Sequence, residues 1–253
     1  MNWHGSLQAL EDIYRTHSLP PSYIAGHPIG IIAVDLIYPK LPGNVANATT
    51  YDFPVLYKKV KFDIELLFEG ASEIEAEIID AARELETEGV RAIIGACGYF
   101  AHFQRQVAEA VNVPVFLSSL CQLPIIKLAL KPSQRIAVLA ASGEDLKDTL
   151  LEKMGANPKD CLIQDIGKLE SFAPIRYGRT ELDNARLAKD LVQMSQAMVR
   201  ENPDIGAILL ECSDLPPYAY DIQAATGLPV FDFITLINWV KQAVVQKRYF
   251  GNF

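Results

Sequence analysis

The amino-acid sequence predicts an α/β protein of two pseudo-symmetric halves, each a parallel sheet flanked by helices. Two observations predict this fold class. Apolar, strand-like segments alternate with helical segments along nearly the whole chain, which is typical of parallel sheets covered on both faces. A segment of the first half that ends in Cys97 recurs in the second half, where it ends in Cys212. We therefore expect a cleft between the halves that both cysteines reach.

The first half begins with an apolar, β-branched run at 29–34, as expected for a parallel strand buried on both faces. A loop rich in proline, glycine and asparagine follows at 38–50, and long loops of this kind are usually functional. Ser72 and Glu75 have the spacing of a capping box, which predicts the start of a helix. The segments predicted after the loop are strand 55–60, helix 72–88, strand 90–96, helix 100–111, strand 113–117 and helix 122–130.

The second half begins after Lys131, where a Lys-Pro-Ser sequence interrupts the pattern. Residues 1–131 therefore form the first half and residues 132–233 the second. Thr180 and Asp183 repeat the capping-box spacing before a long helix. The segments predicted in this half and after it are strand 135–141, helix 144–154, strand 161–166, helix 181–201, strand 205–211, helix 216–225, strand 228–232 and a last helix at 234–247.

The two halves share a gapless internal repeat. An Ala-Ile pair precedes Cys97 and Cys212 at the same distance, and Pro114 and Pro229 follow the two cysteines at the same spacing. Composition alone explains the aliphatic matches, since any two β-α-β units share such residues. It explains poorly a cysteine at the equivalent strand end in both halves, so we interpret the similarity as a true repeat.

Composition excludes several classes of function. The formal net charge of −8 is unfavourable for binding nucleic acid, and no apolar run approaches the roughly 20 residues needed to span a membrane. The N-terminal sequence has acidic residues and no apolar signal core, so we expect a cytoplasmic protein. The four cysteines form no CxxC pair or zinc pattern, and the glycines form no phosphate-binding fingerprint. We expect reduced thiols and no metal or cofactor.

Two thiols facing each other across a cleft can invert a stereocentre. Cys97 and Cys212 each end a strand and precede a helix, and ligands of open α/β sheets bind at these strand ends. A helix N-terminus stabilises a thiolate and also binds a carboxylate. One sulfur can remove the proton next to a carboxylate while the other returns one. Such sulfurs would lie roughly 7 Å apart, too far for a disulfide.

The sequences Gly95-Ala-Cys97-Gly-Tyr-Phe and Glu211-Cys212-Ser-Asp-Leu-Pro-Pro carry a resemblance to a known family. The chain resembles the aspartate/glutamate racemase superfamily, which includes hydantoin racemases, maleate isomerases and arylmalonate decarboxylases. The resemblance implies two Rossmann-like or flavodoxin-like halves, a cofactor-independent reaction with Cys97 and Cys212 as acid and base, and a final helix within 234–253 that packs on the first half. Amino-acid racemases of this family follow the cysteines with Asn-Thr and Thr-Glu, which disfavours aspartate or glutamate as the substrate here.

Substrate-binding candidates surround the two cysteines and the loop after the first strand. In the loop, where the family binds a carboxylate, short polar side chains are equally compatible with ordinary turns. Ser142 and Gly143 lie at the symmetry-related position, although Ser142 and Asp145 also fit a plain capping box. Arg176 could clamp an acidic group, but a solubilising surface role is the simpler interpretation. The candidates are Asn47, Thr49, Thr50, Gly98, Tyr99, Ser118, Ser142, Gly143, Ser213 and Asp214.

The function expected from these residues is that of a racemase or epimerase acting next to the carboxylate or carbonyl of a small, amino-acid-like or hydantoin-like acid. The enzyme would then be a cofactor-independent isomerase with a two-base cysteine mechanism. Alternatives are a single-cysteine isomerase or decarboxylase of the same superfamily, a non-catalytic protein that binds small acids, and a redox switch. The expected partner is a small carboxylic acid, and homo-oligomer formation is left open.

Overall fold

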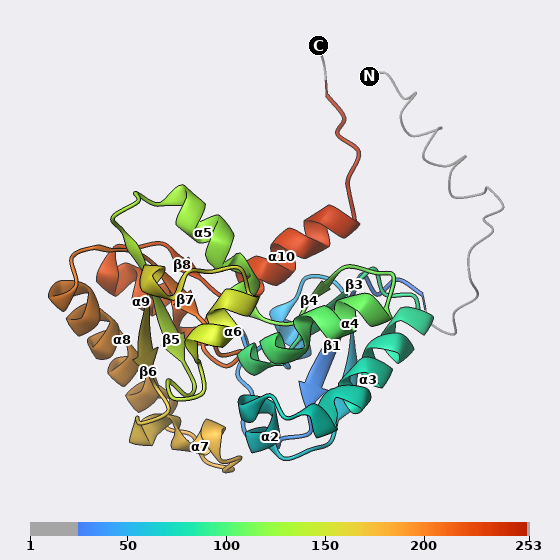
Figure 1. The fold of residues 1–253 in the computed structure, drawn as a ribbon, viewed down its shortest axis with the longest axis horizontal. Helices are drawn as coiled ribbons and strands as arrows, with labels where there is room; N and C mark the ends of the chain where they lie inside the picture. The colour runs from blue at the N-terminus through green and yellow to red at the C-terminus, as the bar shows by residue number, and fades with distance from the viewer. Residues whose placement is uncertain (1–24, 252–253) are drawn as a thin grey trace.

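Two four-stranded parallel sheets form the centres of two lobes in the computed structural model, which describes residues 25–251 (Figure 1). The strand orders are β2-β1-β3-β4 and β6-β5-β7-β8, so both sheets have the same topology. The expected α/β class with two similar halves is confirmed. The first sheet consists of β1 (Ile29–Val34), β2 (Val55–Val60), β3 (Ala92–Gly95) and β4 (Val115–Phe116), and the second of β5 (Arg135–Ala140), β6 (Cys161–Asp165), β7 (Ile205–Leu210) and β8 (Val230–Phe231).

Strand β1 shows how the first sheet is covered on both faces. Ile29 and Ile31 point to one face and belong to a cluster with the last helix, whereas Ile32 points to the other face. Gly30 also faces that second side, where a Cβ would lie 3.1 Å from Leu85 of α3 (Glu75–Thr87). Because side chains alternate along a strand, the uniformly apolar run produces two buried faces.

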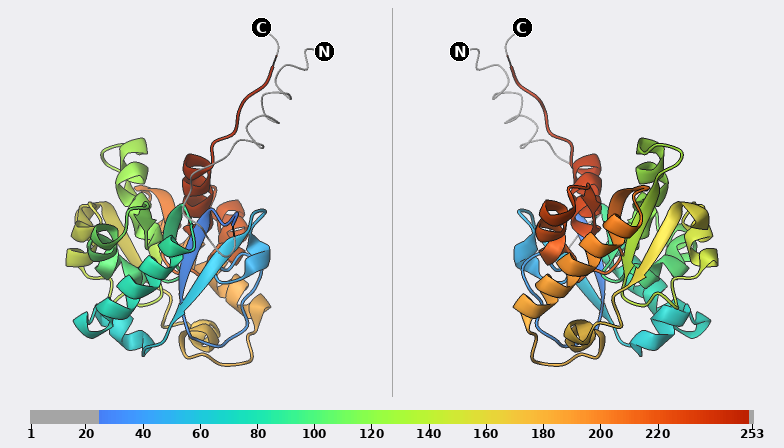
Figure 2. Two further views of the ribbon diagram at one scale, coloured as in Figure 1. Left: turned by 90° about the vertical axis from the view of Figure 1, so that its right-hand side faces the viewer. Right: turned by 90° about the vertical axis from the view of Figure 1, so that its left-hand side faces the viewer.

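The last helix, α10 (Phe233–Val244), packs on the first sheet although the second lobe precedes it in sequence (Figure 2). Phe233, Leu236, Ile237 and Val240 are buried at helical spacing against β1 and β3. Asp232 caps this helix, and its side chain accepts a hydrogen bond from the Thr235 backbone N–H at 2.8 Å. The chain thus crosses between the lobes twice.

Ile237→Ala is expected to destabilise the fold by about 2–5 kcal/mol. Ile237 is fully buried, so its truncation leaves an empty space between α10 and the sheet. The free energy of unfolding measured with urea checks this. Gln242→Ala on the exposed side of the same helix is the control and should stay within about 0.5 kcal/mol of wild type. Equal effects of the two substitutions would show that α10 is not docked on the sheet.

The remaining helices connect the strands and cover the sheets. Helix α8 (Asn184–Glu201) is the longest within residues 25–251, and its residues Leu187, Leu191 and Met198 are buried along one face. No helix within residues 25–251 is long and apolar enough to cross a membrane. The elements not yet named are α2 (Ile64–Glu69), α4 (Gln104–Ala110), α5 (Leu123–Ala129), α6 (Asp148–Lys153), α7 (Ala173–Arg176), α9 (Ala219–Thr226) and the 3-10 turns η1 (Ala48–Thr50), η2 (Ser72–Ile74), η3 (Gly98–Phe103), η4 (Ser119–Gln122), η5 (Pro158–Asp160), η6 (Glu170–Phe172) and η7 (Pro216–Tyr218).

Several local predictions differ from the structure. No side chain caps the turn and helix expected to begin at Ser72, and Asp183 rather than Thr180 caps α8, where its side chain accepts the Arg186 N–H. The helix expected at 144–154 begins only at Asp148, because Ser142 Oγ donates to Asp145 Oδ2 at 2.6 Å instead of capping a backbone N–H. The helix expected at 100–111 is divided into the 3-10 turn η3 and helix α4. The strand expected at 113–117 is reduced to β4, since only Val115 and Phe116 pair with β3.

Candidate active site

One cavity between the lobes contains both repeated cysteines. Cys97 follows β3 and Cys212 follows β7, so each lies just beyond the carboxyl end of an equivalent strand. The cavity has a volume of about 60 Å³. Its walls combine apolar and aromatic side chains with a few charged groups. Those used below are Tyr38, Phe172, Arg176, Glu211 and Asp214.

The Cys212 thiol forms a hydrogen bond with a buried carboxylate. Its Sγ donates to Asp214 Oδ2 at 3.5 Å. Oδ1 of Asp214 accepts the Tyr38 hydroxyl at 2.7 Å and also the Asn44 side-chain N–H. Burial raises the pKa of Asp214, but these donors and Lys40 oppose that shift. Burial and the Asp214 charge raise the pKa of Cys212 well above its usual value, so Cys212 is held as a thiol.

Cys97 has a different environment. Burial and the neighbouring Glu211 raise the pKa of Cys97 above its usual value. The backbone N–H of Tyr99 and the Arg176 guanidinium act in the opposite direction and stabilise the thiolate. Cys97 is the N-cap residue of η3, and the first backbone N–H groups of such a turn have no hydrogen-bond partner within the turn. The Arg176 charge distinguishes Cys97 from Cys212, although burial raises the pKa of both thiols well above its usual value.

Glu211 places a buried carboxyl group between the two cysteines. Its side chain is fully buried, and Oε2 accepts the Ala141 backbone N–H at 3.1 Å. Oε1 has no hydrogen-bond partner among the described residues. Burial, with a smaller contribution from Asp214, raises the pKa of Glu211 to about 8. The side chain fits only because residue 98 is glycine, since a Cβ there would lie 1.7 Å from Oε1.

The residues that follow each cysteine tie the two lobes together. The Tyr99 hydroxyl donates to the Ser142 carbonyl and accepts the Ser142 N–H at 3.1 Å. From the second lobe, Ser213 Oγ donates to the Ala96 carbonyl of the first lobe at 2.9 Å. The Val45 N–H donates to the Ser213 carbonyl at 3.2 Å. These bonds hold the strand ends of both sheets against each other and so define the cavity.

Arg176 lines the cavity from α7, so the expectation of a solubilising surface role is wrong. Its guanidinium makes a two-pronged ion pair with Glu65 of the first lobe, at 2.6 and 2.8 Å. It also lies 4.3 Å from the centre of the Phe68 ring, and only 13% of its side chain is exposed. The planar guanidinium matches a carboxylate well. Arg176 therefore bridges the lobes at the edge of the cavity.

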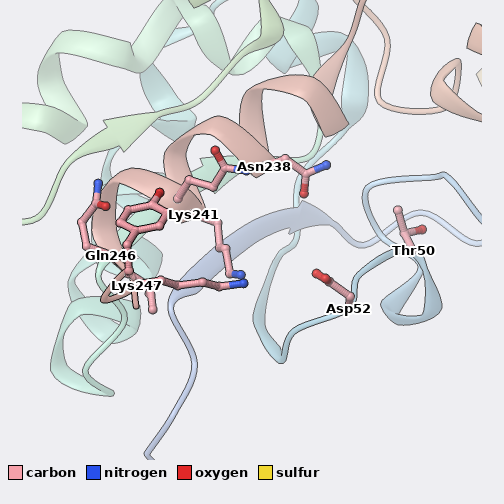
Figure 3. A pocket seen from close by; sticks show the side chains of 9 residues that line it. Thr50, Asp52, Asn238, Lys241, Gln246 and Lys247 are labelled. Atoms are coloured by element: carbon pink, nitrogen blue, oxygen red, sulfur yellow. The ribbon is translucent and has the colours of Figure 1, made fainter. Parts of the chain in front are cut away.

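The polar residues predicted in the loop after β1 lie outside this cavity. Asn47 Oδ1 accepts the Thr49 backbone N–H at 2.9 Å and so caps η1. Thr50 Oγ1 accepts the Gly43 N–H at 2.9 Å. The Thr50 side chain lines a separate hollow beside α10, together with Asp52 and Lys241 (Figure 3). The loop contributes Tyr38 to the cavity instead. Its Asn44 side chain donates a hydrogen bond to Asp214, which lines the cavity.

The other serine and glycine candidates have local structural partners. Ser118 caps η4, where its Oγ accepts the Leu120 N–H at 3.2 Å. Ser142 contributes its backbone to Tyr99, and Gly143 lies against Asp165, where a Cβ would be 2.8 Å away. Among the predicted candidates, the structure gathers Cys97, Cys212, Ser213 and Asp214 in the cavity, with Gly98 and Tyr99 in contact with its walls.

The sequence analysis missed Glu211 and Tyr38 as cavity residues and preferred a surface role for Arg176. A signal for Glu211 was present, because an acidic residue directly after the apolar strand Ile205–Leu210 is unusual unless it has a specific role. Tyr38 had no comparable signal, and for Arg176 the sequence did not distinguish a cavity residue from a surface residue. Each reaches the cavity through the packing of one lobe on the other.

Comparisons with known proteins identify a family and several relatives of this chain. A family model described as Asp/Glu/Hydantoin racemase matches residues 59–239. Dimethylsulfoniopropionate lyase 3 of Emiliania huxleyi (strain CCMP1516) is 33% identical over 258 residues, covering 94% of this chain and 67% of the relative. Dimethylsulfoniopropionate lyase of Durusdinium sp. clade D is 32% identical over 232 residues, covering 88% of this chain and 77% of the relative.

Solved structures share the fold at low sequence identity. Allantoin racemase from Pseudomonas fluorescens has a TM-score of 0.57 at 18% identity, covering 86% of this chain and 91% of that one. Unliganded arylmalonate decarboxylase has a TM-score of 0.53 at 19% identity, covering 85% and 91%. At these identities the likeness concerns the fold alone.

The expectation of an isomerase that racemises or epimerises its substrate is wrong. Curated relatives that match most of the chain at 32–33% identity are lyases. The alternative of another reaction within the same superfamily, such as a decarboxylase, fits these findings better. The physical reason is that removal of a proton next to a carboxylate is common to several reactions. The two cysteines do not by themselves decide what becomes of the resulting anion.

Proposed function

This chain belongs to the Asp/Glu/Hydantoin racemase family, and we propose that within it the chain is a lyase that cleaves dimethylsulfoniopropionate. The observation that carries this proposal is the 33% identity to such lyases over 94% of the chain. The cavity between Cys97 and Cys212 supports it, because this cleavage also begins with removal of a proton next to a carboxylate.

Elimination from this substrate needs one base and no acid. The substrate is a three-carbon carboxylate with a dimethylsulfonium group on the carbon β to the carboxylate. A thiolate removes a proton from the α carbon, the electron pair forms the new double bond, and the C–S bond breaks. Dimethyl sulfide leaves as a neutral molecule, acrylate keeps the carboxylate charge, and the thiolate becomes a thiol. Racemisation, in contrast, needs two groups that both exchange protons.

We assign the base to Cys97. The Tyr99 N–H and Arg176 favour its thiolate, whereas removal of the Cys212 proton would place two negative charges 3.5 Å apart. Cys212 therefore remains a thiol that donates to Asp214 and helps to fix that carboxylate. In the cleavage step, Cys97 accepts the α proton and Cys212 exchanges none.

The charged ends of the substrate match opposite parts of the cavity. A sulfonium carries positive charge without hydrogen-bond donors, so it is stabilised by negative charge and aromatic faces rather than by hydrogen bonds. Asp214 supplies the negative charge, and Tyr38 and Phe172 line the same cavity. The sulfonium therefore lies towards Asp214.

The purified chain is expected to release dimethyl sulfide and acrylate in equal amounts from dimethylsulfoniopropionate. Gas chromatography of the headspace measures the sulfide, and proton NMR measures the acrylate. Propionate is the control, because it has the carboxylate but no leaving group and should give no acrylate. Absence of both products at millimolar substrate would refute the proposed function.

A further inference from the structure

Glu211 is a cavity residue with an oxygen that has no hydrogen-bond partner among the described residues. The residue follows β7, and its side chain reaches across to Gly98 of the first lobe. Glu211 is fully buried and lines the cavity with both cysteines, yet Oε1 has no partner among the described residues. A buried polar group without a partner costs roughly 1–3 kcal/mol, so such an atom at a cavity wall indicates that a ligand completes its bonding.

The hydrogen bonds of Glu211 decide which oxygen carries a proton. Oε2 accepts the Ala141 N–H at 3.1 Å and is thereby fixed as an acceptor. In the neutral acid the proton is therefore on Oε1. The guanidinium of Arg176, which lines the same cavity, is paired with Glu65. Burial and the charge of Asp214 keep the carboxyl group neutral, with its pKa raised to about 8.

We propose that Glu211 binds the substrate carboxylate as a neutral carboxylic acid, donating a hydrogen bond from Oε1. This inference rests on the proposed function, since it assigns the site for one end of that substrate. A carboxylate ligand supplies the acceptor that Oε1 lacks, whereas an ionised Glu211 would repel it. Glu211 and Asp214 then hold the opposite ends of a zwitterion, the first as a donor and the second as an anion.

The same hydrogen bond acts on the reaction step. When Cys97 removes the α proton, negative charge moves onto the carboxylate of the substrate. The hydrogen bond from Glu211 to that oxygen is then stronger in the transition state than in the ground state, so it stabilises the transition state. Glu211 keeps its proton throughout. A neutral Glu211 also avoids the repulsion that would raise the pKa of Cys97 further.

The pH dependence of binding follows from the ionisable groups around Glu211. Asp214 and Cys212 face it from its own strand end, and Cys97 and Tyr99 face it from the first lobe. All four carry either no charge or a negative charge, so none stabilises the ionised carboxyl group. Carboxylate binding is therefore complete below the raised pKa of Glu211, about 8, and is lost as the pH rises through it.

Propionate binding to the full-length protein, measured by calorimetry, tests the proposal independently of turnover. Glu211→Leu removes the donor and is expected to weaken binding about 10- to 100-fold, the effect of one hydrogen bond to a charged group. Glu211→Gln keeps an N–H donor, so it should bind propionate more tightly than Glu211→Leu. It should also lose the decline of binding near pH 8. Glu144→Gln removes an exposed carboxylate and is the matched control.

Two results would overturn the inference. One is a Glu211→Leu protein that binds propionate as tightly as wild type. The other is a Glu211→Gln protein that keeps the wild-type decline with pH, and this second comparison holds even if the leucine variant fails to fold. A protein that shows the expected Glu211 dependence but cleaves no dimethylsulfoniopropionate would refute the proposed function and leave the carboxylate site standing.

Discussion

Cys97→Ser is expected to lower kcat for dimethyl sulfide release by about 10²–10⁴-fold, the usual contribution of a general base. A serine hydroxyl has nearly the size of the thiol but does not ionise at neutral pH. The Tyr99 N–H and Arg176, which favour the thiolate, would then have no anion to stabilise. KM should change much less than kcat, because the carboxylate and the sulfonium are bound by other groups. Steady-state measurement of dimethyl sulfide by gas chromatography checks both values.

Cys212→Ser separates the lyase mechanism from a two-base mechanism. A serine hydroxyl can still donate to Asp214, so kcat should fall far less than for Cys97→Ser. Cys121→Ser is the control, since its thiol donates to Gln104 outside the cavity and should not affect turnover. If the serine variants of Cys97 and Cys212 lose activity equally, the assignment of Cys97 as the sole base is wrong.

Gly98→Ala is expected to destabilise the protein by about 1–3 kcal/mol, as overpacking does in a full core, and to reduce turnover strongly. The new methyl group would lie 1.7 Å from Oε1 of the buried Glu211 side chain. Either Glu211 or η3, which begins at this residue, must shift. Urea unfolding measures the stability, and dimethyl sulfide release measures the activity.

A double-mutant cycle identifies the cause of the Gly98→Ala effect. When Glu211 is replaced by alanine, the colliding carboxyl group is absent, so the added methyl at position 98 should cost much less stability. Activity should stay low in the double variant, because the proposed carboxylate donor is gone. If Gly98→Ala destabilises both backgrounds equally, the collision with Glu211 is not its cause.

The fold was largely predictable because its main signals are local. The uniformly apolar run of β1 and the alternation of strands and helices predict a parallel sheet without reference to distant residues. The repeat around Cys97 and Cys212 correctly indicated equivalent strand ends. Predictions failed where two local patterns competed. Ser142 and Asp145 bond to each other and delay α6, although the same residues could have capped a helix.

The reaction was less predictable than the fold. The family motifs around the cysteines were recognisable, and the family was confirmed by the match over residues 59–239. The isomerase expectation failed because proton removal beside a carboxylate is shared by racemases, decarboxylases and lyases. Whether a leaving group departs depends on the substrate, which two thiols do not specify. The catalytic roles of Cys97 and Cys212 stay predictions.

The residue pattern was enough to predict two parallel sheets and a cysteine just beyond one strand of each, because apolar runs and their alternation with helical segments are local features of the chain. The surroundings of those cysteines, in contrast, follow from the packing of the two lobes. Gly98 of the other lobe leaves room for the burial that raises the pKa of Glu211 to about 8, and Arg176 of the second lobe pairs with Glu65 of the first. Burial and electrostatic energy depend on all neighbouring groups in space, and here those neighbours come from segments far apart in the chain.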